Sequence, residues 1–220
     1  MKDVYLRTLT GCALFEDIEA VDIPTMLRCL SPTVRSYARG EVVFAEGASL
    51  AQVGIVLSGR VQIEQNDYWG NRAILAQAEP GELFGEAFSC AGVRALPVSV
   101  CAALPCEIML IDYRRIVRTC SSACAFHGQL IQNMLRILAE KNVALTQKIE
   151  TVTQRTTRDK LLAYLSAQAR RQGMDAFEIP FNRQELADYL SVDRSAMSSE
   201  LSRMRRDGLV RCEKNRFELL

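Results

Sequence analysis

The sequence has little histidine, tryptophan or proline, with one, one and six residues respectively among 220. It has no uninterrupted apolar run long enough to span a bilayer, and Met1-Lys2-Asp3 does not begin a signal peptide. These absences predict a soluble, cytoplasmic protein with no membrane partner. The single histidine, His127, has no convincing nucleophile, base and acid around it, and a metal-dependent cupin enzyme would need a histidine cluster. We therefore predict a protein that is not an enzyme and has no catalytic residues.

Eight cysteines are present, but no C-x-x-C pair occurs. That absence leaves a zinc ribbon or a thioredoxin-like redox motif unsupported, and in a cytosolic chain of this size most cysteines are small buried residues kept reduced. Cys120, Cys124 and His127 are spaced by four and three residues and would share one face of a helix. A metal or redox site at these three residues is one hypothesis and ordinary packing is the alternative, so no metal ligand is assigned.

Charge is unevenly distributed along the chain, although the net charge is only +1. Residues 1–150 carry 14 Lys and Arg against 16 Asp and Glu, whereas residues 151–220 carry 13 against 10. The positive field therefore lies at the C-terminal end, where a phosphate backbone would be attracted.

Residues from about 13 to 119 contain short apolar runs that are separated or flanked by turn residues such as glycine. This punctuation is typical of an antiparallel sandwich or barrel, and we assign residues 1–120 to a strand-rich domain. A helix is expected at Asp17–Leu30, packed against the outside of the sheet. Strands are expected at Glu41–Phe44, Val53–Leu57, Arg60–Ile63 and Ile108–Ile111, with Gly59 separating the second from the third.

From about Ser122 to Thr153 the apolar period changes to seven residues. A long helix with such a stripe needs a partner, so residues 121–153 predict a homodimer coiled coil. The alternative is packing onto the chain's own domain, which must apply near the start of the helix. Asn142 would cost some stability but fix register and strand number. The d positions are Ile131, Leu138, Leu145 and Val152, and the a positions are Leu135, Asn142 and Ile149.

Residues 154–220 have the pattern of a winged helix-turn-helix domain. A helix is expected over Arg158–Gln172, and Asn182 then caps a short helix in which Glu185 completes a capping box. The turn Ser191–Asp193 follows, and Asp193 is the expected N-cap of the next helix.

That next helix, Arg194–Arg206, is the candidate for entering a major groove, and Gly208 is placed to end it. Small polar side chains beside arginines allow a helix to reach base edges. A terminal hairpin of Val210–Cys212 and Arg216–Leu219 would form the wing. Its buried stripe is expected at Met197, Leu201 and Met204, continued by Leu209, and its opposite face at Ser195, Ser199, Ser202 and Arg206.

Three segments resemble the cyclic-AMP receptor protein/fumarate–nitrate regulator (Crp/Fnr) family of bacterial transcription factors: Gly81-Glu-Leu-Phe-Gly-Glu86, Arg183-Gln-Glu-Leu-Ala-Asp-Tyr-Leu190 and Arg194-Ser-Ala-Met-Ser198. With the order of elements, the resemblance covers nearly the whole chain. It implies an α+β fold in which an N-terminal antiparallel β-roll (a jelly roll of the cyclic-nucleotide-binding kind) senses an effector. A long dimerisation helix and a C-terminal winged helix-turn-helix would follow.

The effector implied by the resemblance is not cyclic AMP. In members that bind cyclic nucleotides, a Gly-Glu pair grips the ribose and a following Arg-Ser or Arg-Thr pair grips the phosphate. Here the phosphate arm is Ala95-Leu-Pro-Val-Ser99, and Arg94 would need a shift of register to serve. A phosphodiester without its cation would lose its strongest contacts. The cofactor and effector stay unassigned, and effector contacts are expected at Gly85, Glu86, Val98, Ser99, Met134, Leu138 and Asn142.

Two other sensor types of the family also fit poorly. The oxygen-sensing branch holds an iron–sulfur centre with closely spaced N-terminal cysteines, and this chain has only Cys12 and Cys29 in that region. Haem-binding relatives offer a histidine ligand, but a single histidine such as His127 is more often packed or solvated.

The resemblance also implies DNA contacts. Family members often present Glu and Arg where this chain has Ser195 and Ser199, and Ser198 matches the serine of the oxygen-sensing branch. Arg194 therefore becomes the main candidate donor to bases or phosphate, whereas Arg183 and Gln184 are expected to hold phosphate. The remaining DNA contacts are expected at Ser202, Arg206, Lys214 and Arg216.

We thus predict an effector-responsive homodimeric regulator that binds a pseudo-palindromic double-stranded operator, with RNA polymerase as a further partner. The rival interpretation is a β-roll module that binds a small molecule without DNA. Such a module would not need the C-terminal third of the chain.

Overall fold

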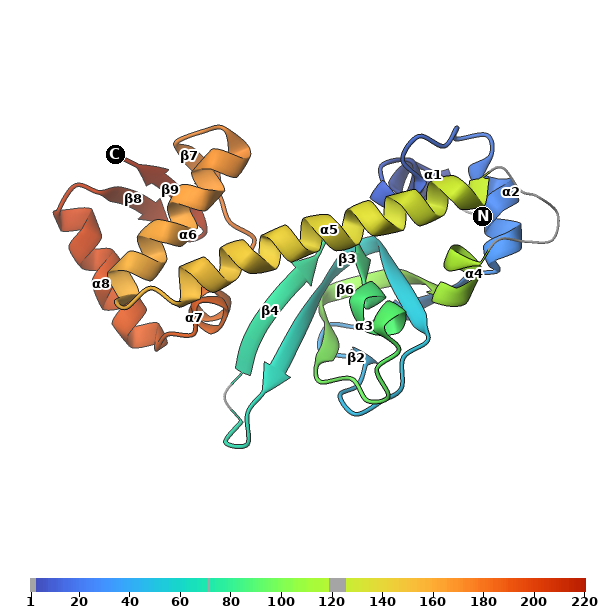
Figure 1. Cartoon of the computed structure of the whole chain (residues 1–220). Helices are drawn as coiled ribbons and strands as arrows, with labels where there is room; N and C mark the ends of the chain where they lie inside the picture. Colours follow the sequence, from blue (N-terminus) through green and yellow to red (C-terminus); the bar gives the residue numbers. More distant parts are fainter. Residues whose placement is uncertain (1–2, 71, 119–125) are drawn as a thin grey trace. The chain divides into compact units, whose positions relative to one another are not determined.

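The computed structural model describes residues 3–70, 72–118 and 126–220 (Figure 1). The chain divides into two compact units, which are described separately. The larger unit is Met1–Gly70 with Leu75–Asn142, and the smaller unit is Asn71–Ile74 with Val143–Leu220. Among the described residues, no helix is both long and apolar enough to cross a membrane.

The sheet of the N-terminal domain has the strand order β1-β6-β3-β4, with β2 paired to β6 and β5 paired to β3. The pairings of β6 with β1, β2 and β3 are antiparallel, which confirms the expected class of fold. Both faces of this sheet carry buried apolar residues: Val56 and Ile108 lie in one core, and Ile55 and Met109 lie in another on the opposite face. The strands are β1 Thr33–Tyr37, β2 Val42–Phe44, β3 Gln52–Asn66, β4 Arg72–Ala78, β5 Leu83–Phe84 and β6 Ser99–Asp112.

The two strands expected on either side of Gly59 are in fact one strand, β3. Gly59 has a φ of +79° and lies where the register between β3 and β6 shifts. A Cβ at this position would lie 2.2 Å from the carbonyl oxygen of Pro105, so the close approach of the two strands requires glycine. The sequence signal taken for a turn is therefore a bulge within a long strand.

The N-terminal helices cover one side of this sheet, and their core joins Leu9, Ile23 and Leu30 to Met109 of β6 and Met134 of α5. The helix expected from Asp17 begins only at Ile23. Asp17 has a left-handed φ of 60°, which a right-handed helix cannot contain, and Pro24 lies in the first turn, where its fixed φ suits a helix start. The helices are α1 Asp3–Thr10, the 3₁₀ turn η1 Ala13–Phe15, α2 Ile23–Leu30, α3 Glu86–Ala91, α4 Tyr113–Val117 and α5 Phe126–Val152.

The smaller unit contains the end of α5, the helices α6, α7 and α8, and a three-stranded sheet of order β7-β9-β8. Its core contains Leu161 and Leu165 of α6, Leu186 of α7 and Phe217 of β9. The expected helices and wing hairpin are present, and β7, which pairs Phe177 with Phe217, adds a strand that was not expected. The elements are α6 Thr157–Gln172, β7 Ala176–Glu178, α7 Arg183–Leu190, α8 Arg194–Arg206, β8 Val210–Glu213 and β9 Arg216–Leu219.

One expectation for α8 is wrong. Met197, Leu201 and Met204 form its buried stripe as expected, but Leu209 does not continue it and is 36% exposed. Gly208 adopts a φ of +71°, so the backbone leaves the helical path before Leu209.

Candidate DNA-binding surface and effector region

Two capped helices with a short turn make up the centre of the smaller unit. The Asn182 side chain accepts hydrogen bonds from the backbone N–H groups of Gln184 and Glu185, and the Glu185 carboxylate accepts one from the Asn182 N–H. The α7 helix ends where Ser191 adopts a left-handed φ of 52°. Asp193 then caps α8 by accepting a hydrogen bond from the Ala196 N–H at 2.9 Å. These local bonds confirm the predicted helix-turn-helix.

The face of α8 opposite its buried stripe is exposed and carries serines and an arginine. Two of its hydroxyls are already donors within the chain: Ser195 donates to Asp193 Oδ1 at 2.5 Å, and Ser202 donates to the Ser198 carbonyl oxygen at 2.9 Å. With its hydrogen used in this way, a hydroxyl offers an incoming base mainly an acceptor oxygen. The exposed side chains of α8 expected to contact DNA are Arg194, Ser195, Ser198, Ser199, Ser202 and Arg206.

The pKa of Asp193 is lowered by the hydrogen bonds it accepts, first from the Ser195 hydroxyl and then from the Ala196 N–H. The cap therefore stays ionised at neutral pH, at the N-terminal end of α8 where a negative charge is stabilised.

The other residues expected to contact DNA differ in exposure and in the partners they have within the chain. The Arg183 guanidinium lies over the Phe217 ring, 5.0 Å from its centroid, and Arg183 Nη1 is buried, so this side chain faces the core more than the surface. The Gln184 amide donates to Asp188 on its own helix at 2.7 Å. Lys214 and Arg216 are exposed at the β8–β9 turn, where Lys214 has a φ of 51°. Arg205 was missed: it is exposed and lines a surface hollow with Ser202 and Arg206.

Part of the heptad stripe of α5 is left exposed by the described residues of the chain. Leu135, Leu145 and Ile149 are 62%, 54% and 59% exposed, and Asn142 is also exposed. Ile131 and Leu138 are half-buried, as expected where the helix packs on its own domain. The side of α5 that packs within the larger unit is a different one, and it is formed by Leu130, Asn133, Met134 and Ile137.

Asn133 connects this inner side of α5 to the N-terminal segment through hydrogen bonds. Its amide donates to the carbonyl oxygens of Leu14 at 3.0 Å and Glu16 at 2.8 Å, and Arg136 forms an ion pair with Glu16 at 2.5 Å. Because the larger unit holds α5 mainly through this inner side, the exposed stripe positions Leu135, Leu145 and Ile149 remain available to another surface.

In the effector region, Glu86 is brought to α5. Its side chain is buried, with the residue only 3% exposed, and its Oε1 forms an ion pair with Lys141 Nζ at 2.8 Å, while Oε2 is buried without a partner among the described residues. Lys141 also donates to the Leu83 carbonyl oxygen. Sequence reasoning missed Lys141, although its spacing of seven from the buried Met134 places both on one side of the helix.

Residues 95–99, which follow α3, are packed against the domain and held by hydrogen bonds. Leu96 and Val98 are buried, and the backbone of Leu96 exchanges hydrogen bonds with Gly47 and Ala48, whereas Arg94 points to solvent. The Ser99 hydroxyl oxygen accepts from the Glu46 N–H at 3.2 Å. Beside them, a Cβ on Gly85 would lie 3.1 Å from the side chains of Phe44 and Leu50, so these residues fill the space next to Glu86.

The expected effector residues are therefore only partly brought together. Glu86 lies near α5 through Lys141, but Met134 belongs to the core under the N-terminal helices, and Asn142 is exposed.

The cysteine and histidine hypotheses are tested only in part. Cys120 and Cys124 lie outside the described residues, and His127 is buried. In the described part of the chain no group of three His, Cys, Asp or Glu residues could hold a metal ion. Burial raises the pKa of the Cys12 thiol to about 11, so this cysteine is a poor ligand at neutral pH, and Cys29 is exposed.

Comparison with known proteins finds a matching family model for the N-terminal domain and another for the C-terminal domain. The family model described as "Cyclic nucleotide-binding domain" matches residues 34–123, and "Crp-like helix-turn-helix domain" matches residues 159–220. The chain is 24% identical over 195 residues to the transcriptional activator protein FnrL of Cereibacter sphaeroides, covering 84% of this chain and 75% of the relative. It is 25% identical over 207 residues to the cyclic AMP receptor protein of Thermus thermophilus, covering 92% and 90%.

A solved structure shows the same fold. The c-di-GMP responsive global regulator CLP of Xanthomonas campestris matches with a TM-score of 0.73 at 20% identity, covering 91% of this chain and 99% of that one.

Proposed function

The chain belongs to the Crp/Fnr family of transcriptional regulators, which carry a DNA-binding helix-turn-helix, and we propose that it binds a pseudo-palindromic operator as a homodimer under the control of a small molecule other than cyclic AMP. The relatives named above are a transcriptional activator protein and a cyclic AMP receptor protein.

The observation that carries the proposal is the exposed serine and arginine face of α8. The helix is capped, its opposite side is buried, and its exposed side chains are short enough to approach base edges. A serine hydroxyl that only accepts suits the amino groups of adenine or cytosine, whereas Arg194 and Arg206 supply positive charge for phosphates. Lys214 and Arg216 on the wing add phosphate contacts.

The homodimer is proposed from the uncovered stripe on α5. Three large apolar side chains in heptad register are more than half exposed. Such exposure to water is unfavourable in a monomer and is normal for the contact stripe of a coiled coil before pairing. Two copies paired through this seam would present two α8 helices to one face of the duplex. Such dimers read half-sites centred about 34 Å apart, one turn of DNA.

Control by an effector is proposed from the ion pair between Glu86 and Lys141. A ligand that hydrogen-bonds the Glu86 carboxylate competes with Lys141 and so changes how α5 lies against its own domain. Cyclic AMP is disfavoured because the arm places apolar Leu96 and Val98 where a phosphate would need a cation. The relative named for cyclic AMP shares only a quarter of its residues with this chain.

The rival proposal, a small-molecule module that works without DNA, is disfavoured by the C-terminal third. Residues 159–220 match a helix-turn-helix model, and a ligand-buffering module has no use for them. RNA polymerase is proposed as a further partner because a bound regulator of this family acts on transcription.

The test is selection from a random pool of double-stranded DNA by the purified full-length protein. We expect enrichment of an inverted repeat whose half-sites are centred about 10 base pairs apart. Failure to enrich any sequence would contradict DNA recognition, whereas enrichment of a single unpaired half-site would contradict the dimer.

A further inference from the structure

Arg158, in the first turn of α6, joins that helix to α8 at two points. Its Nε donates to Glu200 Oε1 at 2.6 Å, and its Nη2 donates to Asp207 Oδ2 at 2.6 Å. Glu200 is in the middle of α8 and Asp207 is its C-cap, so a single planar guanidinium bridges two carboxylates that are seven residues apart. The second oxygen of Glu200, Oε2, is paired with Arg203 at 3.3 Å.

The place of Arg158 in its own helix does not explain its presence. A cation in the first turn of a helix is unfavourable because the N-terminal end of the helix carries partial positive charge. Asp159, the neighbouring residue, meets the usual preference: its carboxylate and N–H both bond the Thr156 hydroxyl. The stabilisation of Arg158 therefore comes from its partners on α8.

The two carboxylates lie on one flank of α8. At 100° per residue, positions seven apart differ by only about 20° around the axis, so Glu200 and Asp207 form one line facing α6. This line is next to the buried stripe of Met197, Leu201 and Met204 and apart from the exposed serines.

The buried stripe of Met197, Leu201 and Met204 sets the rotation of α8 only coarsely, because burial of apolar surface has no direction. Hydrogen bonds from a rigid guanidinium do have direction, and two of them along one line fix both the rotation and the axial position of a helix. The rotation of α8 decides which of its exposed side chains reach base edges.

We propose that Arg158 is a positioning residue for DNA recognition: its guanidinium holds Glu200 and Asp207 and so sets the rotation at which α8 presents its exposed face. The proposal rests on the assignment of α8 as the recognition helix. Arg158 also holds the pKa of Glu200 below its usual range, so the carboxylate stays ionised and the pair persists at neutral pH.

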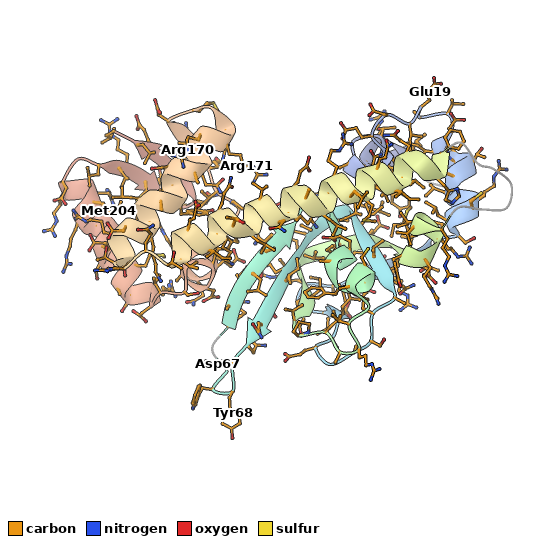
Figure 2. The ribbon with its side chains drawn as sticks, viewed as in Figure 1. Glu19, Asp67, Tyr68, Arg170, Arg171 and Met204 are labelled. Atoms are coloured by element: carbon orange, nitrogen blue, oxygen red, sulfur yellow. The ribbon has the colours of Figure 1, made fainter. Side chains whose placement is uncertain are left out.

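The test compares Arg158→Lys and Arg158→Met with Arg170→Met in the full-length protein. Arg170 is exposed in the last turn of the same helix, at its other end (Figure 2), so its replacement removes the same charge without touching α8. Dissociation constants are measured, at one salt concentration, for the operator selected by the native protein and for a scrambled duplex of the same composition.

Both Arg158 variants should lose about tenfold in the ratio of specific to non-specific affinity, which is the effect of about one misplaced base contact. Arg158→Lys keeps the charge but not the two-pronged geometry, and it carries the test if Arg158→Met unfolds. Arg170→Met should weaken both duplexes equally and leave the ratio unchanged.

A native ratio in Arg158→Lys would overturn the proposal, because charge alone would then suffice. An equal loss on both duplexes in the Arg158 variants would overturn it as well, since that is the behaviour of a phosphate contact. If the native protein itself selects no sequence, the proposed function fails instead, so the two failures are distinguishable.

Discussion

The exposed part of the heptad stripe of α5 allows a quantitative prediction for Leu145→Ala. This change removes three carbon atoms from a side chain that is 54% exposed and that the proposed dimer would bury. At about 0.8 kcal/mol per buried methylene, the exposed half accounts for about 1.2 kcal/mol in each copy. A homodimer carries the change twice, so dimerisation should weaken by about 2.5 kcal/mol, or about 70-fold in the dissociation constant.

Val143→Ala is the matched control. Val143 is 59% exposed on the same helix but lies outside the a and d positions, so its truncation should change the dissociation constant less than about twofold. Sedimentation equilibrium of the native protein and both variants, from nanomolar to micromolar concentration, measures the constants. A monomeric native protein at micromolar concentration, or equal weakening by Val143→Ala, would refute the assignment of the seam.

Further predictions concern the ligand, the DNA and pH. Cyclic AMP should give no tight binding in calorimetry, and a micromolar or tighter constant would mean that Arg94 supplies the missing cation. Lys214→Ala should reduce the slope of log affinity against log salt concentration by about one unit per half-site. Ser199→Arg should instead change the half-site sequence that is selected. The reverse pattern would mean that base and phosphate contacts are misassigned. Burial lowers the pKa of Lys148 from 10.5 to about 8. Between these values the unfolded chain binds more protons than the folded one, so this group makes stability rise with pH, and Lys148→Met should remove that rise. Urea unfolding at a series of pH values measures this rise in stability, and an equal rise in the native protein and the variant would contradict the lowered pKa of Lys148.

Local features of the fold could be predicted from the sequence because their causes are local. The capping box of Asn182 and Glu185 and the cap at Asp193 depend on residues within three positions, and the structure confirms each. The misassigned turn at Gly59 depends on residues far apart in the sequence. Gly59 has the same sequence signature in a turn and in a bulge, and only the close approach of β6 distinguishes the two.

The exposure of the candidate site residues was predictable where neighbouring residues of one helix or hairpin define it. The exposed face of α8 follows from helical periodicity, and the seam of α5 follows from the heptad, because both depend on the angle between residues of one helix. Arg183 had the right residue type and position for phosphate, yet it lies over Phe217, because aromatic packing with a distant strand competes for its guanidinium.

By itself, the sequence determined the order of the strand-rich domain, the long helix and the helix-turn-helix, together with the caps, the heptad stripe and the polar face of α8. Each of these depends mainly on residues that lie near one another in the sequence. Only the tertiary structure decided which charges meet. Lys141 joins Glu86 across the larger unit, and Arg158 joins Glu200 and Asp207, 42 and 49 residues away along the chain. No periodicity relates such partners; they meet because the packing of the apolar faces brings the helices together, and the ion pairs then fix how each helix is turned.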